Sequence, residues 1–222
     1  MVTGGGRGIG SKLVERYLAQ GETVIATARQ PAAVAQLQAA GAEAYQLEVT
    51  DNAAVAALAK QLEGRAIDVL VNNAGVIGGA NPQALGELDL NDWAQTMAIN
   101  VFAPFAITQA LLDNVMASPE KKIVVISSVM GSIANNAAPD KMIYRSSKAA
   151  VNQVCKGLHN ALSPKGAIVV PMHPGWVSSD MGGPSAPVTP TDSAAGLARV
   201  IDALTPAQSG RLWDYQGTEL PW

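Results

Sequence analysis

The chain has 222 residues, of which 48% are hydrophobic and 15% are charged, and its formal net charge is −3. These values predict one large domain spanning residues 1–222 with a substantial core, and they exclude an intrinsically disordered chain. A slightly acidic chain without a block of basic residues is also a poor candidate for nucleic-acid binding.

Residue types that bind metals or form crosslinks are scarce. Cys155 is the one cysteine, which excludes an intrachain disulfide, and His159 and His173 lack a ligand-like spacing, so we expect no metal. The N-terminus does not resemble a signal peptide, and no apolar run approaches the ~20 residues of a membrane span. We therefore expect a cytoplasmic protein without a membrane partner.

Short apolar runs alternate with longer segments of helical spacing. The runs predict strands at residues 23–26, 44–47, 69–71, 123–126, 168–170 and 211–215. The segments between them predict helices at residues 11–20, 32–40, 52–62, 92–116 and 144–162. Most of the runs are continuous rather than alternating, as in strands covered on both faces. The pattern predicts an α/β fold with a doubly wound parallel sheet.

Glycine and proline mark the ends of several segments. Gly21, Gly41 and Gly166 follow helical runs, where a left-handed cap suits glycine. Thr189-Pro190-Thr191-Asp192 predicts a helix start with the threonine as its cap. Residues 174–190 form a long loop rich in glycine, proline and serine, which is typical of a functional lid.

A glycine-rich segment, Thr3-Gly4-Gly5-Gly6-Arg7-Gly8-Ile9-Gly10, stands between a very short first strand, residues 1–3, and a helix. Its glycines allow a tight turn and a close approach of the backbone to a pyrophosphate. The helix that follows offers free N–H groups and a positive dipole end. A plain tight turn is the alternative reading of this segment.

Arginine residues favour NADP(H) over NAD(H) as the cofactor. NAD-binding folds usually carry an acid at the end of the second strand, but Thr27-Ala28-Arg29 stands there instead. Arg7 lies inside the glycine segment, and two guanidinium groups near the ribose would suit a 2′-phosphate. The alternative is that both arginines are solvated surface residues.

Tyr144 and Lys148 lie four residues apart on a predicted helix, and therefore on one face of it. A lysine cation beside a phenol favours phenolate and lowers a tyrosine pKa that starts near ~10. We therefore expect Tyr144 to serve as an acid–base group near neutral pH.

Polar residues also end two predicted strands. Ser127-Ser128 follows one strand and Asn72-Asn73-Ala74-Gly75 follows another, and the carboxyl ends of such strands are where doubly wound sheets bind ligands. Asn100 lies inside a long predicted helix, where asparagine is a mediocre helix former. Each of these residues also has a structural reading, as a turn former or a packing hydrogen bond.

These motifs, in this order, resemble the signature set of the short-chain dehydrogenase/reductase family. The matching segments are Thr3-Gly4-(x)3-Gly8-Ile9-Gly10, Asn72-Asn73-Ala74-Gly75, Asn100, Ile126-Ser127-Ser128, Tyr144-(x)3-Lys148 and Pro174-Gly175-Trp176-Val177. The resemblance covers the whole chain and implies a single-domain Rossmann-type sheet of about seven strands. Residues 209–222 and Met130-Gly131-Ser132-Ile133 resemble the C-factor-like and small carbonyl-reductase branch.

The resemblance also implies roles for the catalytic residues. Tyr144 would donate a proton to a carbonyl oxygen, Lys148 would hold the nicotinamide ribose, and Ser128 would position the substrate oxygen. Asn100 would bind a water that links Lys148 to solvent. The residues expected to contact the cofactor are Gly4, Gly6, Arg7, Gly8, Ile9, Gly10, Arg29, Glu48, Val49, Asn73, Ala74, Gly75, Tyr144, Lys148, Pro174, Val177 and Ser179.

Three positions depart from the family pattern. Glu48 stands where aspartate is usual, Ser179 stands where threonine is usual, and the interval from Ser128 to Tyr144 is longer than the common spacing. The hydroxyl survives at Ser179, and the branch carries a similar insertion. Met130, Trp176 and Met181 fall in loops expected to surround the substrate, which predicts an apolar, adaptable pocket. The loop at residues 174–190 is short for a substrate cover in this family, which predicts that the pocket is small or shallow.

The resemblance implies an NADP(H)-dependent oxidoreductase that reduces a ketone or aldehyde, or catalyses the reverse oxidation. One alternative is a dehydrogenase of another carbonyl class, such as a 3-oxoacyl thioester or a sugar. Another is a cofactor-bound signalling or regulatory protein of C-factor type. The expected partners are a small-molecule substrate and further copies of the chain, in a homodimer or homotetramer paired through residues 92–116 and 144–162.

Overall fold

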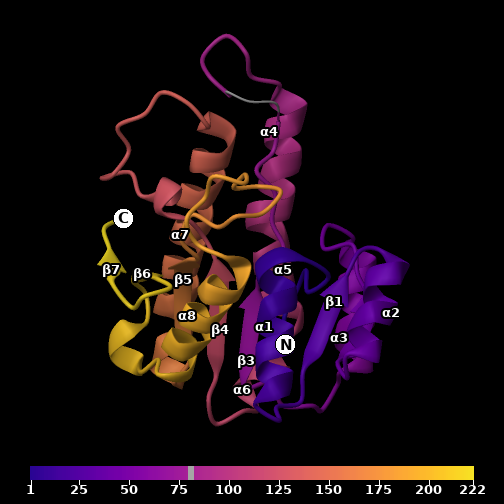
Figure 1. Cartoon of the computed structure of the whole chain (residues 1–222). Helices are drawn as coiled ribbons and strands as arrows, with labels where there is room; N and C mark the ends of the chain where they lie inside the picture. Colours follow the sequence, from indigo (N-terminus) through magenta and orange to yellow (C-terminus); the bar gives the residue numbers. More distant parts are fainter. Residues whose placement is uncertain (80–82) are drawn as a thin grey trace.

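The computed structural model describes residues 1–79 and 83–222 (Figure 1). Its strands are β1 (Ile25–Ala28), β2 (Glu43–Gln46), β3 (Val69–Asn72), β4 (Lys122–Ile126), β5 (Ile168–His173), β6 (Leu212–Asp214) and β7 (Glu219–Leu220). Its α-helices are α1 (Gly8–Ala19), α2 (Pro31–Ala39), α3 (Asn52–Gln61), α4 (Leu90–Met97), α5 (Ala103–Ala110), α6 (Leu112–Met116), α7 (Met142–Leu162) and α8 (Pro190–Asp202).

Residues 1–3 join the strands into one sheet. Val2 bridges Ala26 of β1 and Val71 of β3, both in parallel, so this segment lies between the β1–β2 pair and the run β3-β4-β5-β6-β7. The N–H of Val2 donates to the Ile25 carbonyl (2.8 Å) and the N–H of Thr3 to the Val71 carbonyl (3.0 Å). The expected first strand is thus reduced to one bridging residue, but it occupies the central place.

Alternate residues of the central strands face opposite layers of helices, as the pleat requires. Val124 and Ile126 pack in a core with α1, α2 and α8, whereas Ile123 and Val125 pack in a second core with α3, α5 and α7. Figure 1 shows α1 and α8 side by side across one face of the sheet. The predicted doubly wound α/β fold is confirmed.

The far edge of the sheet departs from a purely parallel arrangement. β6 runs parallel to β5, but β7 turns back and pairs with β6 in antiparallel register, with Leu212 opposite Leu220. The predicted closing strand, residues 211–215, is observed as Leu212–Asp214. A two-residue strand such as β7 carries too little pattern to be found from sequence.

The predicted helix at residues 92–116 is not continuous. It is divided into α4, a π-helical turn at Ala98–Phe102, α5 and α6. Proline has no N–H, so Pro104 cannot donate to the carbonyl of Asn100 four residues earlier, and the chain widens there. The prediction of one helix was wrong because it ran through this proline.

Other element ends follow the expected chemistry. The Thr189 hydroxyl accepts a hydrogen bond from the N–H of Asp192 (3.1 Å) at the start of α8. Gly21, Gly41 and Gly166 have φ values of +82°, +99° and +86°, the left-handed conformation predicted for them. The loops that follow β3, β4 and β5 gather at the top of Figure 1, where the predicted site residues belong.

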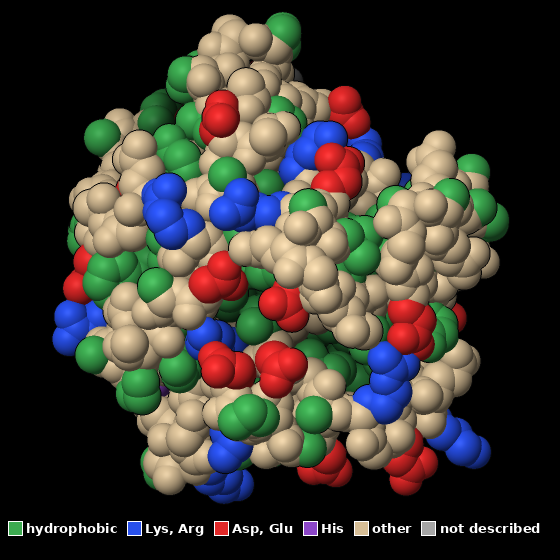
Figure 2. Space-filling model, turned by 60° about the horizontal axis from the view of Figure 1, so that its bottom comes forward, with side chains coloured by type: hydrophobic (Ala, Val, Ile, Leu, Met, Phe, Trp, Pro, Cys, Tyr) green, Lys and Arg blue, Asp and Glu red, His purple; other side chains and the backbone are tan. Residues whose placement is uncertain are grey.

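Charged groups are mixed on the surface. Figure 2 shows Lys and Arg interspersed with Asp and Glu over the face in view. In the described part of the chain no helix is long and apolar enough to cross a membrane. Residues 1–79 and 83–222 also contain no group of three His, Cys, Asp or Glu side chains placed to hold a metal ion.

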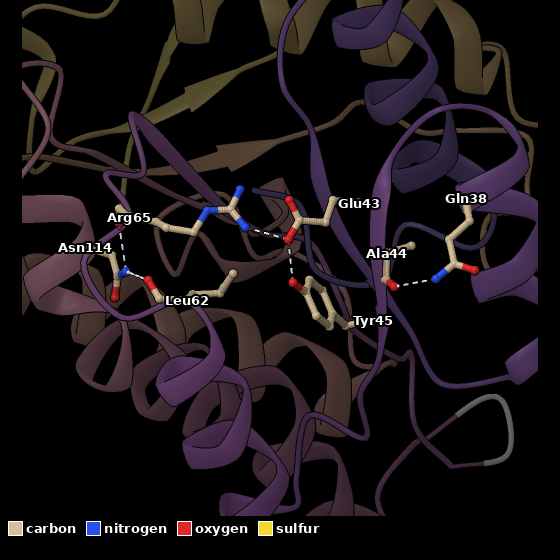
Figure 3. A network of polar contacts seen from close by, with 7 residues as sticks. All are labelled: Gln38, Glu43, Ala44, Tyr45, Leu62, Arg65 and Asn114. Carbon is tan, nitrogen blue, oxygen red and sulfur yellow. Dashed lines mark hydrogen bonds and ion pairs between the residues drawn. The ribbon is translucent and has the colours of Figure 1, made fainter.

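A polar network joins β2, the segment that follows α3, and helix α6 (Figure 3). The buried Asn114 amide donates to the carbonyls of Leu62 (2.5 Å) and Arg65 (2.8 Å). The Arg65 guanidinium in turn donates to Glu43 of β2, and Tyr45 donates to the same carboxylate. The carboxylate is partly exposed, so the Asn114 bonds are the ones shielded from water.

We expect Asn114→Ala to lower the free energy of unfolding by about 1–3 kcal/mol, because two carbonyls lose a buried donor. Glu43→Gln, in the same network, is the control and should change it by less than about 1 kcal/mol, because the Arg65 pair is solvated. Urea denaturation measures both. Equal losses in the two variants would contradict this account of the network.

Candidate active site

Three side chains predicted to act together are adjacent at the carboxyl edge of the sheet. The Ser128 hydroxyl, just past β4, forms a hydrogen bond with the Tyr144 phenol and accepts another from the N–H of Met130 (3.1 Å). The Lys148 ammonium lies 5.6 Å from the centre of the Tyr144 ring and donates to the Ile126 carbonyl (2.8 Å). Tyr144 and Lys148 share one face of α7, as their spacing predicts.

Asn100 reaches this cluster from the π-helical turn. Its amide accepts from the N–H of Val76 (2.9 Å) and donates to the Val76 carbonyl (2.8 Å) and to the Ser147 hydroxyl of α7 (3.0 Å). A Cβ on Gly75 would lie 3.2 Å from the Asn100 oxygen and 3.6 Å from the Lys148 nitrogen. Gly75 therefore leaves the narrow space between these two groups open.

Burial dominates the protonation chemistry of the cluster. It raises the pKa of Tyr144 to about 12, with the Ser128 hydrogen bond acting in the opposite direction. It lowers the pKa of Lys148 to about 8. The expected lowering of the Tyr144 pKa by the lysine is not found in the protein alone, because the ammonium is itself desolvated and turned toward Ile126.

The glycine segment lies against the end of β3. Gly4 and Gly8 have φ values of +66° and +56°, and a Cβ on Gly10 would lie 2.3 Å from the Gly4 carbonyl oxygen. The Asn73 amide donates to the carbonyls of Thr3 (2.9 Å) and Gly4 (3.1 Å). Asn73 therefore holds the turn in shape.

The turn fits a dinucleotide pyrophosphate. Arg7, the N-cap residue of α1, makes no side-chain cap, and the first turn of α1 contains no acidic residue. The positive end of the helix is thus available to an anion. A Cβ on Gly8 would meet nothing within 4 Å, so the surface of the turn is open there.

Both arginines proposed from the sequence to favour NADP(H) are paired with carboxylates. Arg7 lies 2.5 Å from Asp180 in the loop after β5, and all four partners in the two pairs are exposed. Arg29 lies 3.9 Å from Glu48, whose carboxylate also accepts from the Thr50 hydroxyl (3.0 Å). Val49, beside Glu48, is buried in the core.

The loop after β5 is fastened at its neck and at its tip. Val177 and Val188 form a parallel bridge, and the Pro174 carbonyl accepts from the Ser193 hydroxyl (2.6 Å). At the tip, the Ser179 hydroxyl accepts from the N–H of Gly182 (3.2 Å). Asp180 of this tip provides the contact with the glycine turn.

Two of the three predicted pocket residues lie on this loop and are solvent-exposed. Trp176 is 57% exposed and Met181 is 42% exposed, and the Trp176 indole N–H donates to the Gly182 carbonyl (2.8 Å). Met130 is connected to the cluster through its N–H bond to Ser128. An apolar surface is therefore available beside Ser128 and on the loop tip.

Sequence reasoning missed several polar residues at this site. Asn152 of α7 accepts from the Ser127 hydroxyl (2.6 Å), and Gln83 accepts from the N–H of Tyr144 (3.2 Å). Asp180 was missed as the partner of Arg7. Each contact joins residues that are distant in sequence, so no local pattern indicates it. Asp180 is the exception, because it is an acidic residue in a loop that the sequence had already singled out.

Cys155, one turn beyond Asn152, is fully buried, and burial raises its pKa to about 12.

Comparisons with known proteins place the chain among relatives. The chain is 45% identical over 156 residues to C-signal of Myxococcus xanthus, which covers 70% of this chain and 93% of that protein. Its fold matches the carbonyl reductase Sniffer of D. melanogaster with a TM-score of 0.93 and 28% identity, covering 100% and 98% of the two chains. It matches the NADPH-bound carbonyl reductase from chicken fatty liver with a TM-score of 0.91 and 31% identity, covering 100% and 97%.

The family model for the short chain dehydrogenases matches residues 1–188, which include the glycine turn, Asn100, Ser128 and the Tyr144–Lys148 pair. The full-length structural matches extend the similarity to the C-terminal hairpin. The chain therefore belongs to the short chain dehydrogenase family of oxidoreductases, in the branch of the C-factor-like proteins and carbonyl reductases.

Proposed function

We propose that the protein reduces a ketone or aldehyde with NADPH, and that Tyr144 transfers the proton. The observation that carries this proposal is the contact of Ser128 with Tyr144 next to the buried Lys148. Hydroxyl, phenol and ammonium side chains converge there at the edge of the sheet that also bears the glycine turn. The same residues would serve the reverse oxidation of an alcohol.

The proton chemistry follows from the raised pKa of Tyr144, about 12 in the protein alone. A neutral phenol is the form needed to donate a proton to the oxygen of a carbonyl as that oxygen gains negative charge. The bound nicotinamide supplies the hydride. Ser128 donates to the same oxygen and orients it, and the phenolate left behind is stabilised by the adjacent Lys148 cation.

Lys148 and Asn100 are proposed to return a proton to Tyr144. The Lys148 nitrogen and the Asn100 oxygen border the same small space, the one that a Cβ on Gly75 would fill. An ammonium with a pKa of about 8 exchanges its proton readily near neutral pH. Asn100 would hold the water that connects this ammonium to solvent.

The proposed cofactor contacts form three groups. The glycine turn (Gly4, Gly6, Gly8, Ile9, Gly10) would receive the pyrophosphate, and the rim after β3 (Asn73, Ala74, Gly75) would flank the adenosine and nicotinamide riboses, with Glu48 and Val49 near the adenine. Pro174, Val177 and Ser179 would contact the carboxamide. Arg7 and Arg29 would exchange their carboxylate partners for the 2′-phosphate of the cofactor. Because NAD(H) lacks this phosphate, the protein would prefer NADP(H).

The proposed substrate is a small carbonyl compound bound against Met130, Trp176 and Met181. A 3-oxoacyl thioester or a sugar remains the alternative substrate class.

The exposed Phe102 and Phe105 border a groove of about 810 Å³ between α3 and α5, and we propose that a second copy of the chain covers it. The cytoplasmic location stays a prediction from the sequence.

A second candidate function is signalling or regulation with a bound cofactor. The 45% identity with C-signal of Myxococcus xanthus favours it. The retained proton-transfer cluster favours catalysis, because a protein that only binds a cofactor does not require Tyr144 to remain a phenol. The two functions differ in their dependence on that hydroxyl.

Tyr144→Phe tests the proposed reaction. Purified wild type should consume NADPH with some members of a panel of ketones, aldehydes and quinones. The variant should lose at least about a hundredfold in kcat, because the proton donor is gone, and its Kd for NADPH should stay within about threefold of wild type, since only a hydroxyl is removed.

Retained turnover in Tyr144→Phe would contradict the role of the phenol. Absence of turnover by wild type across the panel, with NADPH bound, would favour signalling. A cellular effect that survives Tyr144→Phe would show that signalling does not need catalysis.

Arg29→Asp combined with Arg7→Ser tests the cofactor preference. The double variant should raise the Kd for NADPH by at least about tenfold and lower the preference over NADH, because two cations near the 2′-phosphate are removed. Arg211→Ser, an exposed arginine on the far edge of the sheet paired with Glu219, is the control. An unchanged NADPH/NADH ratio in the double variant would remove the assigned role.

Lys148→Met tests the cost of the buried ammonium in cofactor-free protein. The folded pKa of Lys148, about 8, lies below its unfolded value of 10.5, so the folded state is penalised below pH 8 and gains stability as pH rises from 8 toward 10.5. The variant should therefore melt above wild type at pH 7, with a difference that shrinks by pH 9. Lys156→Met, on the same helix and partly exposed, is the control. A difference independent of pH would contradict this.

A further inference from the structure

Gln83 combines two unusual properties beside the candidate site. It is 1% exposed, and its φ of +59° lies in the left-handed region. A non-glycine residue in that conformation is strained and persists only where surrounding contacts fix it. None of the proposed catalytic or cofactor-binding roles uses this residue.

The contacts that fix Gln83 connect two parts of the site. Its side-chain NH₂ donates to the carbonyls of Ile77 (3.2 Å) and Gly78, and its side-chain oxygen accepts from the N–H of Tyr144 (3.2 Å). Its main-chain carbonyl accepts from the N–H of Met142 (3.2 Å). One residue thus joins the segment after Gly75 to the first turn of α7.

The first turn of α7 needs acceptors from elsewhere in the chain. The first N–H groups of a helix have no partner within it, and leaving them buried without one is costly. The N-cap residue is Lys141, and a lysine side chain has donors only, so it cannot accept from these groups. Gln83 supplies two acceptors, one of them to the N–H of Tyr144 itself.

Asn100 makes a parallel connection one turn farther along α7. It binds both main-chain groups of Val76 and donates to Ser147, whose hydroxyl donates to the Tyr144 carbonyl (2.8 Å). Gln83 binds the next two carbonyls, Ile77 and Gly78, and the Tyr144 N–H. Both backbone groups of Tyr144 are therefore held, directly or through Ser147, to residues 76–79, which follow the proposed cofactor-binding residues 73–75.

Gly78 and Gly79 make the segment fit closely against its neighbours. They have φ values of +69° and +54°, and a Cβ on Gly78 would lie 1.9 Å from the Thr96 hydroxyl oxygen of α4. A Cβ on Gly79 would lie 3.2 Å from the side chain of Ile143. The segment therefore packs closely against both α4 and α7, and hydrogen bonds to its carbonyls connect Gln83 to a well-packed part of the protein.

We propose that Gln83 is a positioning residue for Tyr144: its amide holds the start of α7 at a fixed distance from residues 76–79, the segment that follows the proposed cofactor-binding residues 73–75. This inference rests on the proposed function, since it concerns where the phenol stands relative to the cofactor and the substrate carbonyl. Gln83 does not touch the reacting atoms. It acts through the backbone of Tyr144.

Two variants separate positioning from stability. Gln83→Gly keeps the positive φ without strain and deletes the amide. Gln83→Glu keeps an acceptor for the Tyr144 N–H but, when ionised, turns a carboxylate toward the carbonyls of Ile77 and Gly78. Lys121→Gly is the control, because Lys121 is also a non-glycine residue at positive φ (+49°) but precedes β4 at the opposite edge of the sheet.

Gln83→Gly should lower kcat about ten- to a hundredfold at temperatures well below its melting point, because a small misplacement of a catalytic group is costly. Its Kd for NADPH should stay within about threefold of wild type, and Lys121→Gly should keep the wild-type kcat. In Gln83→Glu, kcat relative to wild type at the same pH should recover as pH falls, because the protonated carboxyl regains a donor. A role in stability alone would produce neither change.

Hydrogen exchange supplies a readout that does not depend on turnover. The Tyr144 amide should exchange at least about tenfold faster in Gln83→Gly than in wild type, because it loses its side-chain acceptor, while Lys121→Gly leaves it unchanged. Wild-type kcat in Gln83→Gly, with only a lower melting temperature, would overturn the proposal. If that variant does not fold, a pH-independent kcat ratio in Gln83→Glu overturns it. If wild type turns over no carbonyl, the proposed function fails, and unchanged exchange in Gln83→Gly separately overturns the inference.

Discussion

The arrangement of the whole site depends on the double pairing of residues 1–3. Val2 lies between β1 and β3, so the two parts of the sheet become continuous, and the chain leaves this central position directly into the glycine turn. The turn then meets the end of β3 so closely that Gly10 has room for no side chain. The N-terminus of α1 is thereby held beside the strand ends that carry Asn73 and Ser128.

Burial, more than charge, sets the chemistry of the cluster. Tyr144 and Lys148 are both withdrawn from water, so the phenol is held neutral and the ammonium is easily deprotonated. A neutral phenol that can donate a proton, beside an ammonium that can replace that proton, suits the proposed reduction of a carbonyl. The charged residues that remain, Arg7 and Arg29, lie at the exposed margin and are balanced by Asp180 and Glu48, so the 2′-phosphate proposed to bind there would displace a carboxylate from each.

The sequence was sufficient where function depends on regular geometry. Strand–helix alternation predicted the doubly wound fold, and the four-residue spacing predicted that Tyr144 and Lys148 share a face of α7. It was insufficient where a single residue changes a regular element, as Pro104 does by widening the chain around Asn100. It was also insufficient for Gln83, whose contacts span 61 positions to Tyr144 and have no local signature. The predicted direction of the Tyr144 pKa shift was wrong for a related reason, since burial is a property of the folded core and cannot be seen in a four-residue motif.

The reactivity of Cys155 reports on local unfolding around α7. It is the one cysteine of the chain, its side chain is fully buried on α7, and its thiol is held protonated by a raised pKa. Thiol reagents attack the exposed thiolate, so the closed protein is inert toward them. The rate at which such a reagent labels the protein therefore measures how often α7 separates from the sheet, and no engineered probe is needed.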